Sequence, residues 1–281
     1  MVDQTTDKLQ ENSKYIVIRD VIRKKNPSLL RWLPGFVLRY IERVLHEDDI
    51  NAIMAKIGHL HGLDFVDALI EELGVEVTLS GQEHIPAEGG VIFASNHPLG
   101  GLDGVAFMHA MGKHRKDIKF IVNDILLNIK NLEPLFVGVN KHGSQGRHSL
   151  EQIEQAYAGD HALLVFPAGL VSRKQRGEIK DLEWKKSFIN KAKRHKKDII
   201  PVFIDGRNSN FFYTFAKLRE NVGIKANIEM FYLPGEMFAR RGKKVSIRIG
   251  EPIPYTHFDN SKSEKEWAEY VKKIVYRISP E

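Results

Sequence analysis

The stretch of sequence that decides the fold is GVIFASNHPLGGLDG, residues 90–104. Its first five residues form a continuous apolar run, which is typical of a strand buried on both faces. A proline and two glycines follow and predict a tight turn, after which residues 104–111 have the composition of a helix. A buried strand that runs through such a turn into a helix indicates a parallel α/β sheet.

The same pattern continues through the chain after residue 74, where short apolar segments alternate with amphipathic segments of helix length. This alternation predicts an α/β fold with a mostly parallel sheet flanked by helices. Ser263 and Glu266 form a predicted capping box for the last helix. The other predicted strands are 75–79, 119–122, 135–139, 163–166, 199–204 and 245–249, and the other predicted helices are 150–157, 184–194, 212–219 and 263–277.

The sequence pattern predicts an N-terminal helical extension at residues 1–74 and the main domain at residues 75–281. Apolar side chains recur near a 3.6-residue period in the extension, as they do on one face of a helix. Two interpretations stay open, a helix that packs on a core and a helix that lies among lipid headgroups. The side chains that support the second are Arg31, Trp32, Phe36, Arg39, Tyr40 and Arg43.

The composition bounds the class of protein. The chain has 281 residues, 42% of them hydrophobic, which is ample for a packed core. It has no cysteine, which excludes disulfides and thiolate metal sites. No apolar run reaches the roughly 18–20 residues that span a bilayer, and the polar start lacks the pattern of a secretory signal. We therefore expect a soluble or peripheral protein.

The charge is unevenly placed along the chain. The formal net charge is +6, but residues 170–248 hold 20 Lys/Arg against 8 Asp/Glu, a net +12. Such a basic face suits an anionic membrane, a phosphorylated substrate or nucleic acid, and it is also what a solvated surface looks like. No nucleic-acid recognition motif accompanies it, so we do not expect nucleic acid as a partner.

His97 and Asp103 are the residues that carry chemistry in the first motif. The carboxyl end of a strand in a parallel sheet is where catalytic groups collect. A histidine there can take a proton from a hydroxyl, and a carboxylate on its other ring nitrogen fixes the tautomer. A strand-to-helix turn with a capping acid is the alternative explanation of the same residues.

Asn96-His97 followed by Asp103 resembles the first sequence block of the glycerolipid acyltransferase family. Three further blocks follow in the family's order: LFVGVNK at 135–141, FPAGLVSR at 166–173 and IPV at 200–202. The resemblance covers residues 91 to 203 and extends to about 258. It implies the family's α/β fold and acyl transfer to a lipid hydroxyl.

The chain departs from the family pattern at three places that matter. Five residues separate His97 from Asp103, whereas the family has four, and Ala168 stands where the third block has an acid. Leu170 and Val171 replace the threonine and arginine of that block. The altered blocks resemble a branch often labelled hemolysin-related, which includes O-acyltransferases that make aminolipids. The resemblance therefore implies an acceptor other than the usual lysophosphatidic acid, which stays as the alternative together with a non-catalytic membrane-binding protein.

The resemblance implies a site and a set of partners. His97 is the general base and Asp103 orients it, while an acyl carrier protein or acyl-CoA donates the acyl group to a lyso-lipid, a lyso-aminolipid in this branch. The chemistry needs no metal or redox cofactor, and the one histidine cluster, HLHGLD at 59–64, is not a predicted metal site. We expect the protein at the cytoplasmic face of an anionic membrane. The predicted substrate-binding residues are Asn96, Gly100, Gly101, Lys141, Gly169, Ser172, Arg173 and Arg207.

Overall fold

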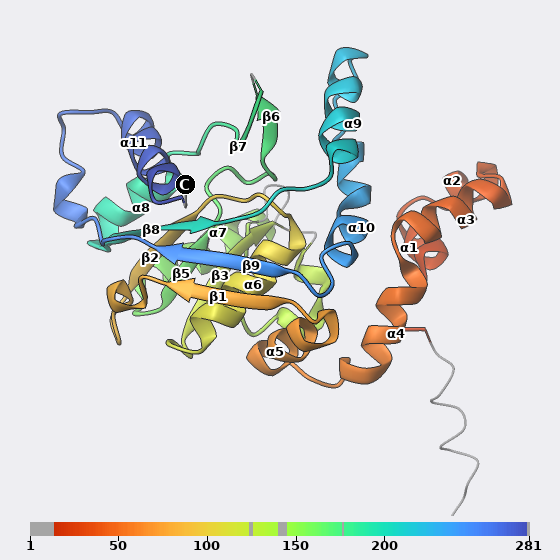
Figure 1. Cartoon of the computed structure of the whole chain (residues 1–281), viewed down its shortest axis with the longest axis horizontal. Helices are drawn as coiled ribbons and strands as arrows, with labels where there is room; N and C mark the ends of the chain where they lie inside the picture. The colour runs from red at the N-terminus through yellow and green to blue at the C-terminus, as the bar shows by residue number, and fades with distance from the viewer. Residues whose placement is uncertain (1–13, 124–125, 140–144, 176, 280–281) are drawn as a thin grey trace, which may run out of the picture. The chain divides into compact units, whose positions relative to one another are not determined.

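The computed structural model describes residues 14–123, 126–139, 145–175 and 177–279 (Figure 1). The chain divides into two compact units, residues 1–59 and residues 60–281. Among the described residues, no helix combines the length and the hydropathy that crossing a bilayer requires.

Unit 1 is helical throughout its described part. Glu47 is buried there and accepts hydrogen bonds from the Lys14 Nζ and the main-chain N–H of Ile18, each at 2.9 Å, which ties the start of the first helix to the start of the last. Trp32, Phe36 and Tyr40 are exposed. The helices of unit 1 are α1 (Ile18–Lys25), α2 (Pro27–Trp32), α3 (Gly35–Val44) and α4 (Glu47–Ile57).

Unit 2 is built on a seven-stranded sheet, which confirms the predicted α/β fold with a mostly parallel sheet. Every neighbouring pair is parallel except β8 and β9, which are antiparallel. Each predicted strand is present within one residue of its expected bounds. In sheet order the strands are β1 (Glu76–Ser80), β9 (Lys244–Ile249), β8 (Ile199–Ile204), β2 (Val91–Ser95), β5 (Ala162–Val165), β3 (Ile118–Asn123) and β4 (Phe136–Val139).

A short strand pair and a short helix of unit 2 were not predicted. The strands β6 (Arg173–Gln175) and β7 (Glu178–Lys180) form a separate antiparallel pair, and their polar sequences carry no strand pattern. The helix α10 (Leu233–Phe238) follows a 3₁₀ turn, η5 (Ile228–Tyr232). The other 3₁₀ turns are η2 (Gln82–His84), η3 (Leu126–Asn128), η4 (Lys130–Leu132) and η6 (Tyr255–His257).

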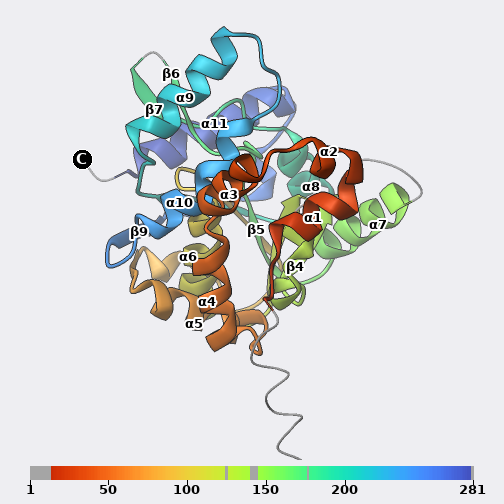
Figure 2. The same cartoon turned by 90° about the vertical axis from the view of Figure 1, so that its right-hand side faces the viewer.

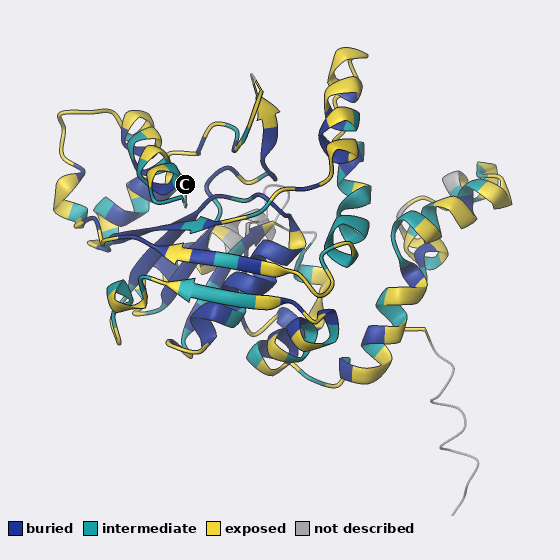
Figure 3. Cartoon of the chain, in the orientation of Figure 1, coloured by how far each residue is buried: buried dark blue, intermediate teal, exposed yellow. Residues whose placement is uncertain are grey.

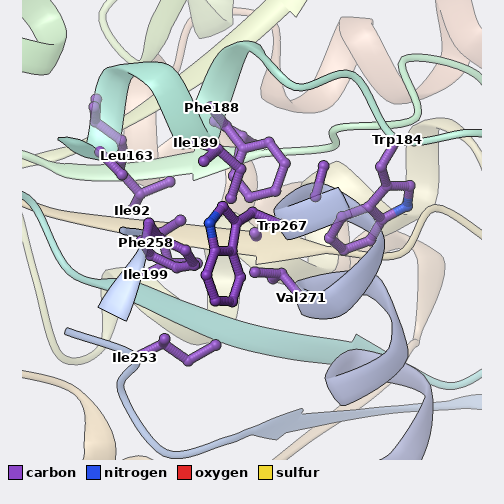
Figure 4. Close-up of a cluster of buried hydrophobic side chains, with 14 of the residues drawn as sticks. Ile92, Leu163, Trp184, Phe188, Ile189, Ile199, Ile253, Phe258, Trp267 and Val271 are labelled. Carbon is purple, nitrogen blue, oxygen red and sulfur yellow. The ribbon is translucent and has the colours of Figure 1, made fainter. Parts of the chain in front are cut away.

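Helices cover both faces of the sheet, as a parallel sheet requires. The alternating side chains of β2 show this directly, because all five of its residues are buried. Ile92 packs in a cluster with Phe188 and Trp267 on one face (Figure 4), whereas Phe93 meets Phe107 on the other, with ring centroids 6.4 Å apart. The longer helices of unit 2 are α5 (Gly62–Leu73), α6 (Gly101–Gly112), α7 (Gln145–Ala158), α8 (Ser187–His195), α9 (Asn210–Asn221) and α11 (Glu264–Arg277).

The helix α5 belongs to unit 2, although residues 60–74 were predicted to be part of the N-terminal extension. Its buried side, which includes Phe65, Val66 and Ile70, packs on α6. An amphipathic helix has the same pattern whichever neighbour covers its apolar face, so the sequence could not assign α5 to a unit.

The topology brings three loops to one edge of the sheet. β2, β5 and β8 are adjacent and parallel, so their carboxyl ends point the same way. The loops that follow Ser95, Val165 and Ile204 therefore meet at this edge, and they contain most of the residues that were predicted to form the site.

Candidate active site

His97 and Asp103 are in direct contact. His97 lies just beyond the end of β2, and Asp103 lies in the first turn of α6. The Nδ1 of His97 is 2.8 Å from the Oδ2 of Asp103. The Asp103 carboxyl is fully buried, whereas the His97 side chain is 16% exposed. Because Nδ1 is held by the carboxylate, Nε2 is the ring nitrogen available to accept a proton.

Gly100 explains how the longer spacing between the two residues is accommodated. Its φ of 82° and ψ of −127° lie in a region that other residues rarely adopt. The main-chain N–H groups of Leu99 and Gly100 both donate to the Asp103 Oδ2, at 2.8 and 3.1 Å. The extra residue is thus absorbed in a turn that wraps around the carboxylate, and the predicted His97–Asp103 contact forms.

The burial of Asp103 affects its protonation. Removal from water raises the pKa of the carboxyl above its ordinary value, and the hydrogen bonds from His97, Leu99 and Gly100 lower the pKa only in part. Its Oδ1 has no hydrogen-bond partner among the described residues. The Asp103 carboxyl is therefore desolvated, and its main side-chain partner is the His97 imidazole.

Phe166 fixes the plane of the His97 ring. It follows β5 and stacks on the imidazole, with centroids 4.1 Å apart and planes 17° apart. Phe120 on β3 meets the same phenyl ring edge-on at 5.2 Å. The imidazole is therefore oriented by a carboxylate at one nitrogen and by an aromatic ring on one face. Phe166 was not among the predicted site residues, although it begins one of the motif blocks.

The main chain of His97 is held by Ser172 and Asp181. The N–H of Ser172 donates to the carbonyl of His97 at 2.8 Å. The Oδ1 of Asp181 accepts from the N–H of His97 at 3.2 Å and from the Oγ of Ser172 at 2.5 Å. The other carboxylate oxygen of Asp181 accepts from the Nε1 of Trp184 at 2.9 Å. Ser172, predicted to bind substrate, thus contacts the loop that carries His97.

Asp181 is a site residue that sequence reasoning missed. It is buried, and it lies between the motif blocks at 166–173 and 200–202. A buried acid looks like a surface acid in sequence, because nothing local marks the long-range partners that bury it. The nearest signal was Trp184, whose ring N–H needs an acceptor when buried.

Asn96 links two strands at the site. Its Nδ2 donates to the carbonyl of Ile204 at 2.9 Å, and its Oδ1 accepts from the N–H of the same residue at 2.7 Å. The end of β2 is thereby joined to the end of β8. Asn96 was predicted to contact substrate, but the structure commits both ends of its amide to the protein.

Arg173 is engaged inside the protein. It is buried, and its Nη2 donates to the Glu229 Oε1 at 2.6 Å while its guanidinium lies 5.3 Å from the ring centre of Phe212. Arg219 on α9 also donates to Glu229, at 3.1 Å. The charge of Arg173 is therefore compensated, and contact with a headgroup would require it to leave Glu229.

The remaining predicted residues differ in their accessibility. Gly101, Gly169 and Arg207 are exposed at the edge where β2, β5 and β8 end. A Cβ placed on Gly169 would lie 2.5 Å from the Lys185 Nζ, so this lysine lies over the loop after β5. Arg207 donates to the Asn210 Oδ1 at 2.5 Å. Lys141 lies outside the described residues.

The site can act as a general base on a hydroxyl. A neutral imidazole with Nδ1 on a buried carboxylate presents a basic Nε2, and the carboxylate stabilises the imidazolium that forms. Within the described part of the chain, no group of three His, Asp or Glu side chains is placed to hold a metal ion.

Comparison with known proteins places these features in a family. The model of a family described as acyltransferase matches residues 20–280. A lyso-glycine lipid O-acyltransferase of Bacteroides thetaiotaomicron is 43% identical over 96% of this chain and 100% of its own length. A protein of the same name from Phocaeicola vulgatus is 39% identical over 99% of this chain and its own full length.

Among solved structures, the 1-acyl-sn-glycerophosphate (LPA) acyltransferase PlsC from Thermotoga maritima aligns with 86% of this chain and 90% of its own. The TM-score is 0.47 and the sequence identity is 17%.

Proposed function

The chain belongs to the acyltransferase family, and on that basis we propose that it transfers a fatty acyl group to the hydroxyl of a lyso-aminolipid, a lyso-glycine lipid. The observation that carries the proposal is the His97–Asp103 pair at the carboxyl end of β2. Two relatives whose names state this acceptor match almost the whole chain, which supports it.

The reaction follows from the geometry of the pair. The Nε2 of His97 takes the proton of the acceptor hydroxyl while the oxygen attacks the carbonyl carbon of the acyl thioester. The tetrahedral adduct then collapses, the carbon–sulfur bond breaks, and the imidazolium returns the proton to the departing thiolate. Asp103 stabilises the imidazolium between these steps. The donor in this proposal is the thioester of an acyl carrier protein or of coenzyme A.

The N–H of Gly101 is the best placed to stabilise the oxyanion. Three glycines of the motif blocks are candidates for this role. The N–H of Gly100 is bound to Asp103 at 3.1 Å, and that of Gly169 donates to the carbonyl of Phe166 at 3.0 Å. Gly101 begins α6, where the first N–H groups have no partner within the helix and the helix dipole favours negative charge. Its N–H has no hydrogen-bond partner in the described part of the chain.

Two cations suit the carboxylate of a glycine headgroup. Arg207 follows β8 and Lys185 lies over Gly169 after β5, so both belong to the edge that carries His97. A guanidinium can bind a carboxylate through two hydrogen bonds. Ala168 stands where the family has an acid, and it is buried in the core cluster, so the position offers no polar group to an acceptor.

The acceptor is a lipid, so the proposal includes a peripheral position on an anionic membrane, at its cytoplasmic face. The net +12 of residues 170–248 and the exposed aromatic and basic side chains of α3 support this. Salt should weaken binding to anionic vesicles, because the Debye length falls from about 10 Å at 0.1 M to about 3 Å at 1 M.

The test is a direct comparison of substrates. Purified enzyme is assayed with lyso-glycine lipid and with lysophosphatidic acid, each paired with an acyl carrier protein thioester and with acyl-CoA. We expect a higher kcat/KM with lyso-glycine lipid, whichever donor is used. A higher kcat/KM with lysophosphatidic acid contradicts the proposed acceptor, and it would favour the usual phospholipid reaction instead.

A further inference from the structure

Exposed hydrophobic side chains gather on α9 and the segment after it. Of the thirteen large hydrophobic side chains that are exposed among the described residues, five lie between residues 211 and 231. Most of the others are in unit 1, and only two are elsewhere in unit 2. The five are Phe211, Leu218, Val222, Ile224 and Phe231.

One side of α9 forms a continuous apolar stripe, which we call the α9 outer face: Phe211, Phe215, Leu218 and Val222. Their spacing of four, three and four residues puts them in one line along the helix. The two phenylalanines stack with centroids 5.8 Å apart, and Tyr232 meets both rings edge-on. Leu218 and Val222 are 56% and 62% exposed. Figure 3 shows exposed residues along this helix.

The opposite side of α9 is already packed, so the outer face cannot turn inward. Phe212 and Tyr213 are buried there with Val171 in a small core cluster. Arg219 is also buried on this side and is bound to Glu229, which in turn binds Arg173 on β6. α9 is in contact with β6 and lies beside it in Figure 2, and α9 stands away from the sheet in Figure 1. Tyr232 lies against the two phenylalanines, and Leu218 and Val222 remain largely exposed among the described residues of unit 2.

The unpaired charges that α9 and its neighbouring segments expose are positive. Lys217 on α9, Lys225 just after it and Lys174 on β6 are exposed, and none of them has an ion pair among the described residues. Glu220 is the acid on α9, and it is paired with Arg219 at 3.4 Å. An apolar stripe on a segment whose unpaired exposed charges are lysines is complementary to an anionic lipid surface, which takes apolar groups below its headgroups and cations among them.

The outer face is joined to the catalytic edge. α9 begins directly after the loop that follows β8, and the Tyr213 hydroxyl accepts from the N–H of Asn208 in that loop at 3.0 Å. The next helix, α10, brings Leu233 against Gly100, since a Cβ on this glycine would lie 3.0 Å from the leucine. A surface that binds α9 thus lies next to the edge that carries His97.

We propose that the α9 outer face inserts into the surface of an anionic bilayer and holds the catalytic edge of unit 2 against the lipid. The inference rests on the proposed function in one respect, that the acceptor is a membrane lipid. It adds a membrane contact on the catalytic unit itself, separate from the basic and aromatic side chains of unit 1.

The absence of cysteine from the chain allows a site-specific test. The full-length Val222→Cys variant is labelled with an environment-sensitive fluorophore, and a Leu150→Cys variant serves as the matched control. Leu150 is 60% exposed on α7, so the two positions are alike in exposure. Vesicles of phosphatidylglycerol and phosphatidylcholine in equal parts are added, and emission and quenching by iodide are recorded. The label reports on its own position, whatever unit 1 does.

We expect the label at residue 222 to shift to the blue and to become protected from iodide, while the label at residue 150 does neither. Equal responses at both positions, or none at 222 while the protein cosediments with the vesicles, overturn the proposal. A response at 222 that needs no vesicles but follows protein concentration, or that follows an acidic acyl carrier protein, overturns it in favour of a second copy or of the carrier.

A second pair of variants links the contact to catalysis. Leu218→Gln/Val222→Gln should bind the same vesicles roughly tenfold to a hundredfold more weakly, because two half-exposed apolar side chains no longer enter the lipid. Leu150→Gln should bind as the wild type does. Activity on acceptor in vesicles should fall with binding, whereas activity on acceptor in detergent micelles should be unchanged. Loss in both forms contradicts the inference, and a wild-type enzyme inactive on the aminolipid contradicts the proposed function alone.

Discussion

Replacing Asp181 with asparagine should impair catalysis through the main chain of His97. The carboxylate accepts three hydrogen bonds, from the N–H of His97, the Oγ of Ser172 and the Nε1 of Trp184. An asparagine has one oxygen, which best replaces the Oδ1 that serves His97 and Ser172. Its amide then faces the indole N–H, so two donors meet where a donor met an acceptor.

The structure sets the size of the effect. Loss of a hydrogen bond to a charged acceptor costs about 1.5–3 kcal/mol, so Asp181→Asn should lower the unfolding free energy by roughly 2 kcal/mol. Repulsion between the new side-chain amide and the Trp184 indole N–H also strains the hydrogen bond to the His97 main chain. Because small misplacements of a catalytic group are costly, we expect kcat to fall by roughly tenfold to a hundredfold with little change in KM. Urea unfolding and steady-state kinetics on the same preparations measure both.

A control variant separates positioning from stability. Trp184→Phe removes the indole N–H and leaves the bonds from His97 and Ser172 to Asp181 in place. It should lose stability, through a lost bond and a small cavity, while kcat stays near that of the wild type. In the double variant Asp181→Asn/Trp184→Phe the two donors no longer meet. Its loss of unfolding free energy should therefore be smaller than the sum of the losses in the two single variants. An unchanged kcat in Asp181→Asn, with stability reduced as predicted, would refute the positioning role.

Three other changes have outcomes that follow from the site. Gly100→Ala should lose stability and activity, because φ is 82° there and the new Cβ would lie 3.0 Å from Leu233; thermal unfolding at an unchanged midpoint contradicts this. Burial raises the pKa of Asp103. The unfolding free energy of the wild type relative to Asp103→Asn should therefore be greatest below about pH 4 and decline as the pH rises through the raised pKa. A difference between the two proteins that does not vary with pH contradicts this prediction. Arg207→Gln should raise KM for lyso-glycine lipid with kcat retained, and an unchanged KM removes this residue from the headgroup site.

The sheet could be predicted from the sequence because its central strands are buried on both faces. Ile199–Ile204 and the strand before His97 are continuous apolar runs, and such runs between turn residues leave few alternatives. The one antiparallel pairing in the sheet was not predictable. The antiparallel pairing of β8 with β9 depends on how residues 210–238 return to the sheet, which no local pattern encodes.

The contact between His97 and Asp103 could be predicted, whereas most of the residues that support it could not. His97 and Asp103 are six positions apart, so a turn model suffices to bring them together. Arg173 was expected to bind a headgroup because it is a cation of its motif block. Its partner Glu229 lies 56 residues away, and nothing in the sequence links the two. Asp181 escaped notice for the same reason. Sequence motifs indicate candidate groups for chemistry, but long-range burial decides which charges remain available.

The His97→Ala variant tests the central claim most directly. The measurement is kcat for acyl transfer to lyso-glycine lipid in detergent micelles, with the folded state of the variant checked by its urea midpoint. If the Nε2 of His97 takes the proton of the acceptor hydroxyl, kcat should fall by about 10²–10⁴-fold while the protein stays folded. A folded His97→Ala enzyme that turns over at close to the wild-type rate would contradict the account.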